Sequence, residues 1–187
     1  MTLLTTSDVP AKYPNPGGLE KPIVVEPSDA LAQSLYKLID AQPFFKGLTV
    51  AQLELLAASA MEMKFEAGQT IFAAGNPANR FYLILEGKVV LESEVAEHNQ
   101  MVVQTLWPGD DLGWSWLFAP YSLHFTARAV ETTKTIFFYG TRLREQCEAD
   151  HELGYQMMRR IAEVATKSLQ AIQLSLMKTK DPEKLDQ

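Results

Sequence analysis

Two short segments carry the residue types that could hold a small anionic or aromatic molecule. LGWSWLF occupies residues 112–118 and HFTARA occupies residues 124–129. Backbone N–H groups that follow a glycine into a short helix can point at an anion, and tryptophan and arginine can stack on a base or pair as π face and cation. The residues in these segments with such capacities are Gly113, Trp114, Ser115, Trp116, Phe125, Thr126 and Arg128, and they are candidates for one ligand site if the fold brings the two segments together.

Strand geometry leaves two interpretations of these residues open. Side chains alternate along a strand, so Thr126 and Arg128 share one face while Phe125 and Ala127 share the other. In the first interpretation Arg128 and the N–H groups after Gly113 form an anion site. In the second, the aromatics fill a vestigial pocket and Arg128 makes a structural ion pair. If Thr126 faces solvent, Arg128 does too, and the first interpretation weakens.

The sequence contains no recognisable catalytic or metal-binding motif. The three histidines, His98, His124 and His151, show neither His-x-His nor His-x-x-x-His spacing, although two close histidines are typical of metal-binding strands and helices. There is no Gly-x-Ser-x-Gly, P-loop or dinucleotide glycine motif. We therefore expect no catalytic residue, no metal and no cofactor, in a protein that is not an enzyme.

Composition places the chain among ordinary globular proteins. Its 187 residues are 47% hydrophobic and 21% charged, which suits one domain of about 100–150 residues with appended segments. Cys147 is the single cysteine, which predicts a reducing, cytoplasmic location without disulfides. No apolar run approaches the roughly 20 residues of a membrane span, and no secretion signal is recognisable. The net charge of −6 argues against a nucleic-acid surface.

The chain is organised in three parts. Residues 1–27 contain five of the ten prolines and predict an extended N-terminal arm. Ser28 and Thr49 can cap two short helices, ALAQSLYKLID and VAQLELLAASA. From 61 to about 139, short β-branched and aromatic runs separated by glycines predict a sandwich or barrel, with FYLIL buried on both faces. Residues 28–140 thus form one β domain, and residues 141–187 form C-terminal helices, the last with a helical apolar stripe.

These landmarks resemble the cyclic-nucleotide-binding domain family, which includes the N-terminal domain of catabolite-activator-type regulators. The resemblance rests on PFFKGLT at 43–49, FEAGQTIFAAG at 65–75, FYLILEGKV at 81–89 and PGDDLG at 108–113, in that order. It implies a mainly β fold with flanking helices, a double-stranded β-helix (jelly-roll or β-roll) followed by a long C-terminal helix.

The resemblance also shows where this chain departs from the family. Members that bind cyclic nucleotide carry a glutamate after the glycine, which accepts from the ribose, and an arginine that neutralises the phosphate. By register Trp114 stands at the glutamate position, Phe125 at the arginine position and Arg128 at a Thr/Ser position. Each lost anchor could remove about 2–4 kcal/mol, so we expect weak or absent cAMP and cGMP binding. Haem, sensed by some relatives, could use His98, His124 or Cys147, but their spacing selects none of them.

The last helix predicts a dimer. In catabolite-activator-type proteins the corresponding helix pairs with its twin, and the resemblance implies an interface at Leu153, Met157, Ile161, Val164, Ile172 and Leu176. The same stripe could instead pack on its own β-roll. No DNA-binding domain follows, so we expect no direct DNA binding and no membrane contact, but a protein partner.

Two functions remain open. One is a regulatory module that senses a small molecule, such as a nucleotide, and signals through its C-terminal helix by a population shift. The other is a ligand-free dimeric interaction or scaffold module that has lost nucleotide binding. A pocket that binds a ligand saturably would favour the sensor, whereas an empty or side-chain-filled pocket would favour the scaffold.

Overall fold

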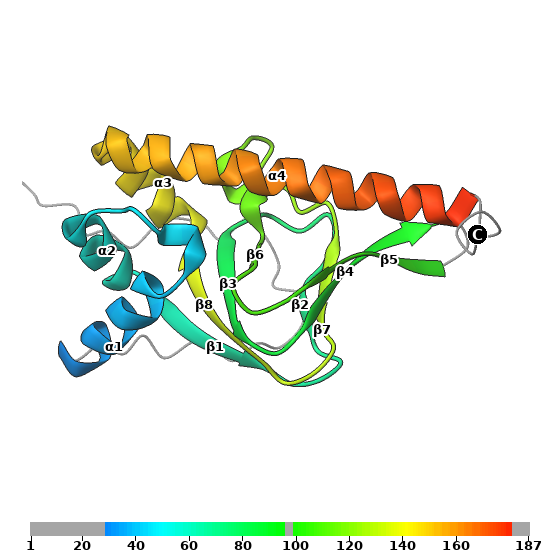
Figure 1. Ribbon diagram of the computed structural model, residues 1–187, viewed down its shortest axis with the longest axis horizontal. Coiled ribbons are helices and arrows are strands. Elements are labelled where there is room, and N and C mark those ends of the chain that lie inside the picture. Colours follow the sequence, from blue (N-terminus) through cyan, green and yellow to red (C-terminus); the bar gives the residue numbers. More distant parts are fainter. Residues whose placement is uncertain (1–28, 96–98, 181–187) are drawn as a thin grey trace, which may run out of the picture.

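The structure is a computed structural model that describes residues 29–95 and 99–180. The predicted proline-rich arm at residues 1–27, its neighbour Ser28 and His98 lie outside the described residues. Among the described helices, none combines the length and apolarity that a membrane span requires. A β-roll and the helices that flank it make up the fold (Figure 1).

In the part of the chain that the structure describes, two helices and a short 3₁₀ turn precede the roll. They are α1 (Asp29–Asp40), η1 (Pro43–Phe45) and α2 (Val50–Ala57). The predicted cap of α2 is confirmed, because Thr49 accepts from the Gln52 backbone while the Gln52 side chain accepts from the Thr49 backbone, a reciprocal capping box. The inward face of α2 buries Leu53, Leu56 and Ala57.

Within residues 29–95 and 99–180, eight strands form two antiparallel four-stranded sheets, which confirms the jelly-roll. The strands are β1 (Met61–Phe65), β2 (Thr70–Phe72), β3 (Arg80–Glu86), β4 (Val89–Val95), β5 (Asn99–Leu106), β6 (Asp111–Leu112), β7 (Thr126–Ala129) and β8 (Thr133–Tyr139). One sheet has the order β1-β8-β3-β6 and the other β2-β7-β4-β5. β6 therefore ends the first sheet and β5 ends the second.

A tight turn at Gly87 joins β3 to β4 and admits no side chain. Its φ is +96°, and a Cβ there would lie 2.6 Å from the Thr132 carbonyl oxygen. Gly68, with φ +83°, has open space around the same position. The left-handed backbone costs an L-residue about 1–2 kcal/mol, and overpacking adds to it only at Gly87.

We therefore expect Gly87→Ala to lower the free energy of unfolding by about 2–3 kcal/mol. The matched variant Gly68→Ala carries the backbone strain without the clash, so it should lose only about 1 kcal/mol. Urea unfolding of the two variants measures the difference. Equal losses would show that the close approach to Thr132 does not limit this turn.

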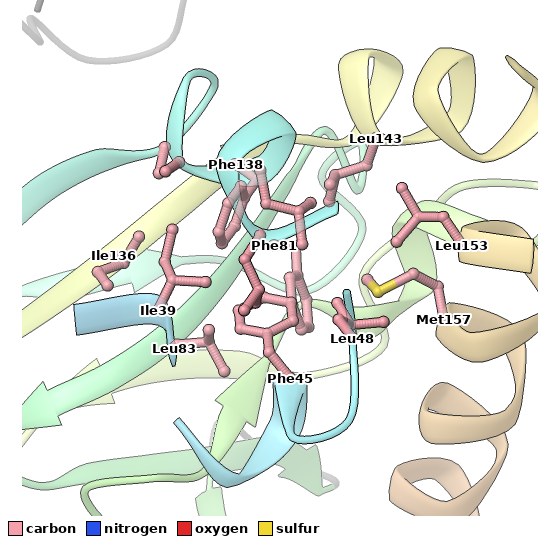
Figure 2. Close-up of a cluster of buried hydrophobic side chains, with 14 of the residues drawn as sticks. Ile39, Phe45, Leu48, Phe81, Leu83, Ile136, Phe138, Leu143, Leu153 and Met157 are labelled. Atoms are coloured by element: carbon pink, nitrogen blue, oxygen red, sulfur yellow. The ribbon is translucent and has the colours of Figure 1, made fainter. Parts of the chain in front are cut away.

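The apolar core joins the roll to both helical segments. In Figure 2 the roll contributes Phe81 and Phe138, η1 contributes Phe45, and the C-terminal helices contribute Leu143 and Met157. These last two belong to α3 (Gly140–Ala149) and α4 (His151–Lys180). The prediction that FYLIL is a buried strand is confirmed for residues 81–84 of β3, which are all buried, while Leu85 is partly buried.

α4 carries two apolar faces, and the five predicted interface residues whose side chains are described lie on the inward one. Leu153, Met157 and Ile161 are fully buried against the core of their own chain, so they cannot present themselves to a second copy. Val164 faces a cavity and Ile172 packs against the roll, while the side chain of Leu176 lies outside the described residues. The residues on this face are buried because α4 runs along the roll, as Figure 1 shows.

Candidate ligand-binding site

A cavity of about 290 Å³ lies between the roll and α4. The roll side is formed by β2, β4, the end of β5, residues 109–115 and the segment that leads into β7, and the η1 loop borders the cavity as well. The α4 side spans 159–168. The lining side chains that matter below are Phe72, Gln104, Asp111, Trp114, Ser115, Phe125, Arg160, Lys167 and Ser168. The site is thus shared by two structural units, and neither encloses it alone.

A β-bulge turns Gln104 toward this cavity. Leu91 of β4 pairs with Gln104, but the next residue, Glu92, pairs with Val102, so Val103 is an extra residue in β5. Val103 and Leu106 both pack in the roll core, and Gln104 lines the cavity. A bulge re-aims the side chains that follow it, which explains how a polar residue of an edge strand faces inward.

Asp111 lies on β6, the end strand of the first sheet, and follows a turn that is fixed by hydrogen bonds. The Trp107 N–H donates to the Asp110 carboxylate at 2.8 Å, and the Gly109 N–H donates to the Ile84 carbonyl at 2.9 Å. The turn thereby fixes the start of β6 on β3. Burial and, to a smaller extent, the charge of Asp110 raise the pKa of Asp111 to about 7, while a hydrogen bond with its own backbone and the charge of Lys167 oppose the shift. A carboxyl group with such a pKa inside a cavity marks a candidate functional site.

Gly113 shapes the next part of the wall. Its φ is +82°, and a Cβ would lie 2.6 Å from the Arg80 carbonyl oxygen, so the chain can pass β3 here only as glycine. The short helix η2 (Trp114–Leu117) follows. Trp114 and Ser115 line the cavity, whereas Trp116 is 0% exposed and belongs to the apolar core.

The predicted site residues therefore separate into two groups. Gly113, Trp114, Ser115 and Phe125 line the cavity, while Trp116, Thr126 and Arg128 do not.

Arg128 is engaged elsewhere. Its Nε donates to Glu92 at 3.1 Å, and its Nη1 donates to the Gly68 carbonyl and the Thr70 hydroxyl. Thr126, on the same face, accepts from the Ala74 N–H. This arrangement corresponds to the structural ion pair, and Arg128 does not bring a cation to the cavity.

The sequence reasoning missed the α4 side of the site. Arg160 is only 7% exposed. Its guanidinium donates to the carbonyls of Phe44 and Lys46, and to Gln156. Arg160 thus fastens α4 to the η1 loop. The available signal was the position of Arg160, which lies three residues after Met157 and four before Val164, on the helix face that carries these apolar side chains.

The described residues support neither a reactive cysteine nor a metal site. Burial raises the pKa of the half-buried Cys147 thiol to about 11, which disfavours the reactive thiolate. Across residues 29–95 and 99–180, no three His, Cys, Asp or Glu side chains gather as metal ligands would. What the cavity offers is hydrogen bonding, charge and aromatic surface.

Comparison with known proteins assigns the fold to a family. Residues 62–150 match the family model of the cyclic nucleotide-binding domain. A solved protein of Geobacter metallireducens GS-15, named as cyclic nucleotide-binding, shares 30% identity at a TM-score of 0.64, over 74% of this chain and 97% of that one. The regulatory subunit of a cAMP-independent protein kinase A from Trypanosoma brucei shares the fold, at 20% identity and TM-score 0.61, over 80% of this chain and 52% of that one.

A curated relative is a regulator of transcription. The CRP-like cAMP-activated global transcriptional regulator of Mycobacterium tuberculosis is 24% identical over 118 residues, which are 63% of this chain and 53% of that protein. The chain therefore spans about half the length of the curated relatives it matches. With its jelly-roll, its glycine-led η2 and its long C-terminal helix, this chain belongs to the cyclic nucleotide-binding domain family.

Proposed function

We propose that the chain is a cytoplasmic sensor module in which a small molecule other than a conventionally bound cyclic nucleotide occupies the cavity and acts on α4. The observation that carries the proposal is the shared construction of the cavity, with Gln104 and Asp111 on the roll side and Lys167 and Ser168 on the α4 side. An occupant that contacts both sides changes the free energy of α4 packing on the roll. Such differential contact is what a population shift requires.

The wall chemistry supports a ligand other than cAMP or cGMP. Trp114 and Phe125 line the cavity at the positions where the resemblance places the ribose and phosphate anchors. Both are aromatic, so neither can accept from a ribose hydroxyl or neutralise a phosphate. The named cAMP independence of the trypanosome kinase subunit fits a use of this fold without cAMP.

Thermal unfolding tests the proposal. Purified protein is heated with cAMP, cGMP, cyclic dinucleotides, nucleosides, nucleotides or haem at millimolar concentration. We expect cAMP and cGMP to leave Tm unchanged and at least one other compound to raise it by a few degrees, because a ligand that binds only the folded state stabilises it. Gln104→Trp, which fills the cavity from the roll side, should abolish that increase. No increase with any compound would favour the ligand-free scaffold.

A second copy of the chain is the partner that α4 supports best. Besides its buried face, α4 exposes Tyr155 (62%), Met158 (50%) and Leu169 (61%). With Ala162 and Ala165 these residues are spaced by three and four in alternation, which is the heptad spacing of a seam between two helices. The dimer interface then lies on this outward stripe, opposite Leu153, Met157 and Ile161.

Disrupting the outward stripe should separate the copies. Met158→Glu with Leu169→Glu places like charges across the seam at exposed positions, so each chain should stay folded while the dimer dissociates. Sedimentation of the variant should give a monomer where the unaltered chain gives a dimer. The control Glu152→Gln changes an exposed residue of α4 outside the stripe and should remain dimeric. A dimer that survives both glutamates would exclude this face.

A further inference from the structure

One carboxyl oxygen is buried in the wall between the roll and α4 without a partner. Oδ2 of Asp111 is closed off from solvent, and no group in residues 29–95 and 99–180 forms a hydrogen bond with it. Native proteins rarely retain such an atom, because an unsatisfied buried polar group destabilises the fold. The size of that cost depends on the charge of the carboxyl group, since a buried carboxylate without a partner costs far more than a buried neutral acid.

The helix α4 is packed on the roll on either side of the cavity but not over it. Ile161 is fully buried in the core before the cavity, and Ile172 packs against the roll core beyond it. Between these two contacts, Val164, Lys167 and Ser168 line the cavity. Segments with few packed apolar contacts open at a lower cost than the core. The middle of α4 is therefore the part of the wall that can separate from the roll most easily.

Charged groups from several segments share this wall with Asp111. Besides its neighbour Asp110, the charged or titratable side chains that line the cavity are Lys46 after η1, His124 before β7, and Arg159, Arg160, Glu163 and Lys167 of α4. Burial is the largest cause that raises the pKa of Asp111 to about 7, followed by the charge of Asp110. A hydrogen bond with its own backbone and the charge of the exposed Lys167 oppose the shift.

We propose that Asp111 is a proton-operated switch for the middle of α4. With the carboxyl group neutral, residues 163–168 of α4 lie on the roll as the structure shows. When the proton leaves to solvent, the buried carboxylate is unstable in this position, and the helix separates from the roll so that water reaches the charge. The switch acts on the same helix as the proposed ligand but needs no ligand.

The proportion of open chains should rise with pH. In the open state the carboxyl group has the pKa of an ordinary aspartate, about 3.9, whereas in the closed state its pKa is about 7. Between these values the open state has lost a proton that the closed state retains. Linkage then raises the ratio of open to closed chains about tenfold per pH unit, until the ratio levels off above about pH 7. From pH 5 to pH 8 the ratio should increase about a hundredfold.

Thiol labelling of the unliganded chain measures this opening. Ser168 is 8% exposed and lines the cavity, so Ser168→Cys in a Cys147→Ser background places a reporter thiol on the covered side of α4. Its labelling rate, divided by that of a small-molecule thiol at the same pH, should rise about a hundredfold between pH 5 and pH 8. Thr135→Cys in the same background reports unfolding of the whole chain, because Thr135 is fully buried in β8. It should be labelled more slowly than position 168 at every pH.

Further variants identify the group that releases the proton. Asp111→Asn, added to the Ser168→Cys reporter, should remove most of the rise, because a carboxamide does not ionise. Lys167→Gln removes a charge that favours the carboxylate, so the rise should extend to higher pH. His124→Gln is the matched control, since histidine is the side chain that ordinarily titrates in this range, and it should leave the profile unchanged. Thermal unfolding of each variant confirms that it is folded.

Three results would overturn the switch. Equal labelling of the two reporters would mean that proton release requires unfolding of the whole chain. An unchanged profile in Asp111→Asn would assign the proton to another group, and a profile lost in His124→Gln would assign it to the imidazole. If Asp111→Asn does not fold, Lys167→Gln decides, because it alters an exposed side chain, and a profile that does not move to higher pH contradicts the role of Asp111.

Discussion

Replacing Trp114 with glutamate and Phe125 with arginine should increase the affinity of this chain for cAMP several hundred-fold or more. Both residues line the cavity, at the positions where the family resemblance places the ribose acceptor and the phosphate partner. Each restored charge-assisted contact contributes about 2–4 kcal/mol in a buried setting. Calorimetric titration of the double variant with cAMP measures the gain.

The single variants serve as the controls. Trp114→Glu restores only the ribose contact and Phe125→Arg only the phosphate contact, so each should recover part of the affinity. The glycine that leads into η2 is unchanged in all of them, which keeps the backbone N–H groups of 114–116 in place. A folded double variant without any gain would mean that the pocket differs from that of its relatives beyond the two anchors.

Asp111→Asn should stabilise the fold by about 3–4 kcal/mol at pH 8. Burial, the largest cause, and the charge of Asp110 raise the pKa of Asp111 to about 7 in the folded chain, and Lys167 only partly offsets them. An unfolded aspartate has a pKa of about 3.9. Between these values the folded state retains a proton that the unfolded state has lost, so the contribution of Asp111 is fully present below about pH 4. It is lost as the pH rises toward 7.

Urea unfolding between pH 5 and 8 measures this change in the free energy of unfolding. The unaltered chain should lose stability over the interval, whereas Asp111→Asn, which is neutral throughout and nearly the same shape, should lose much less. Asp40→Asn, at an exposed position, should follow the unaltered chain. Parallel pH profiles for Asp111→Asn and the unaltered chain would contradict the assignment of a raised pKa to this carboxyl group.

Features set by local sequence could be predicted well. The glycine turns, the Thr49 cap and the buried β3 follow from backbone and periodicity rules that act over a few residues. The jelly-roll follows from their order and the family resemblance.

Features set by tertiary packing could not be predicted. The inward direction of Gln104 depends on a bulge at Val103 that the alternation of β5 does not reveal. The choice between the two apolar faces of α4 depends on the roll against which it packs. Arg160 illustrates this, because its partners lie on the distant loop that carries Phe44 and Lys46. Asp111 became a candidate only once the turn and its burial were known.

Amide hydrogen exchange of α4 tests the central claim most directly. The protein is labelled with and without a saturating mixture of nucleosides and nucleotides, and the exchange of residues 159–172 is compared with that of α1, which lies away from the cavity. The account predicts slower exchange across this part of α4 and across β5 and β6, with α1 unchanged. Identical exchange in all of these segments, with and without the mixture, would contradict a ligand site that acts on the helix.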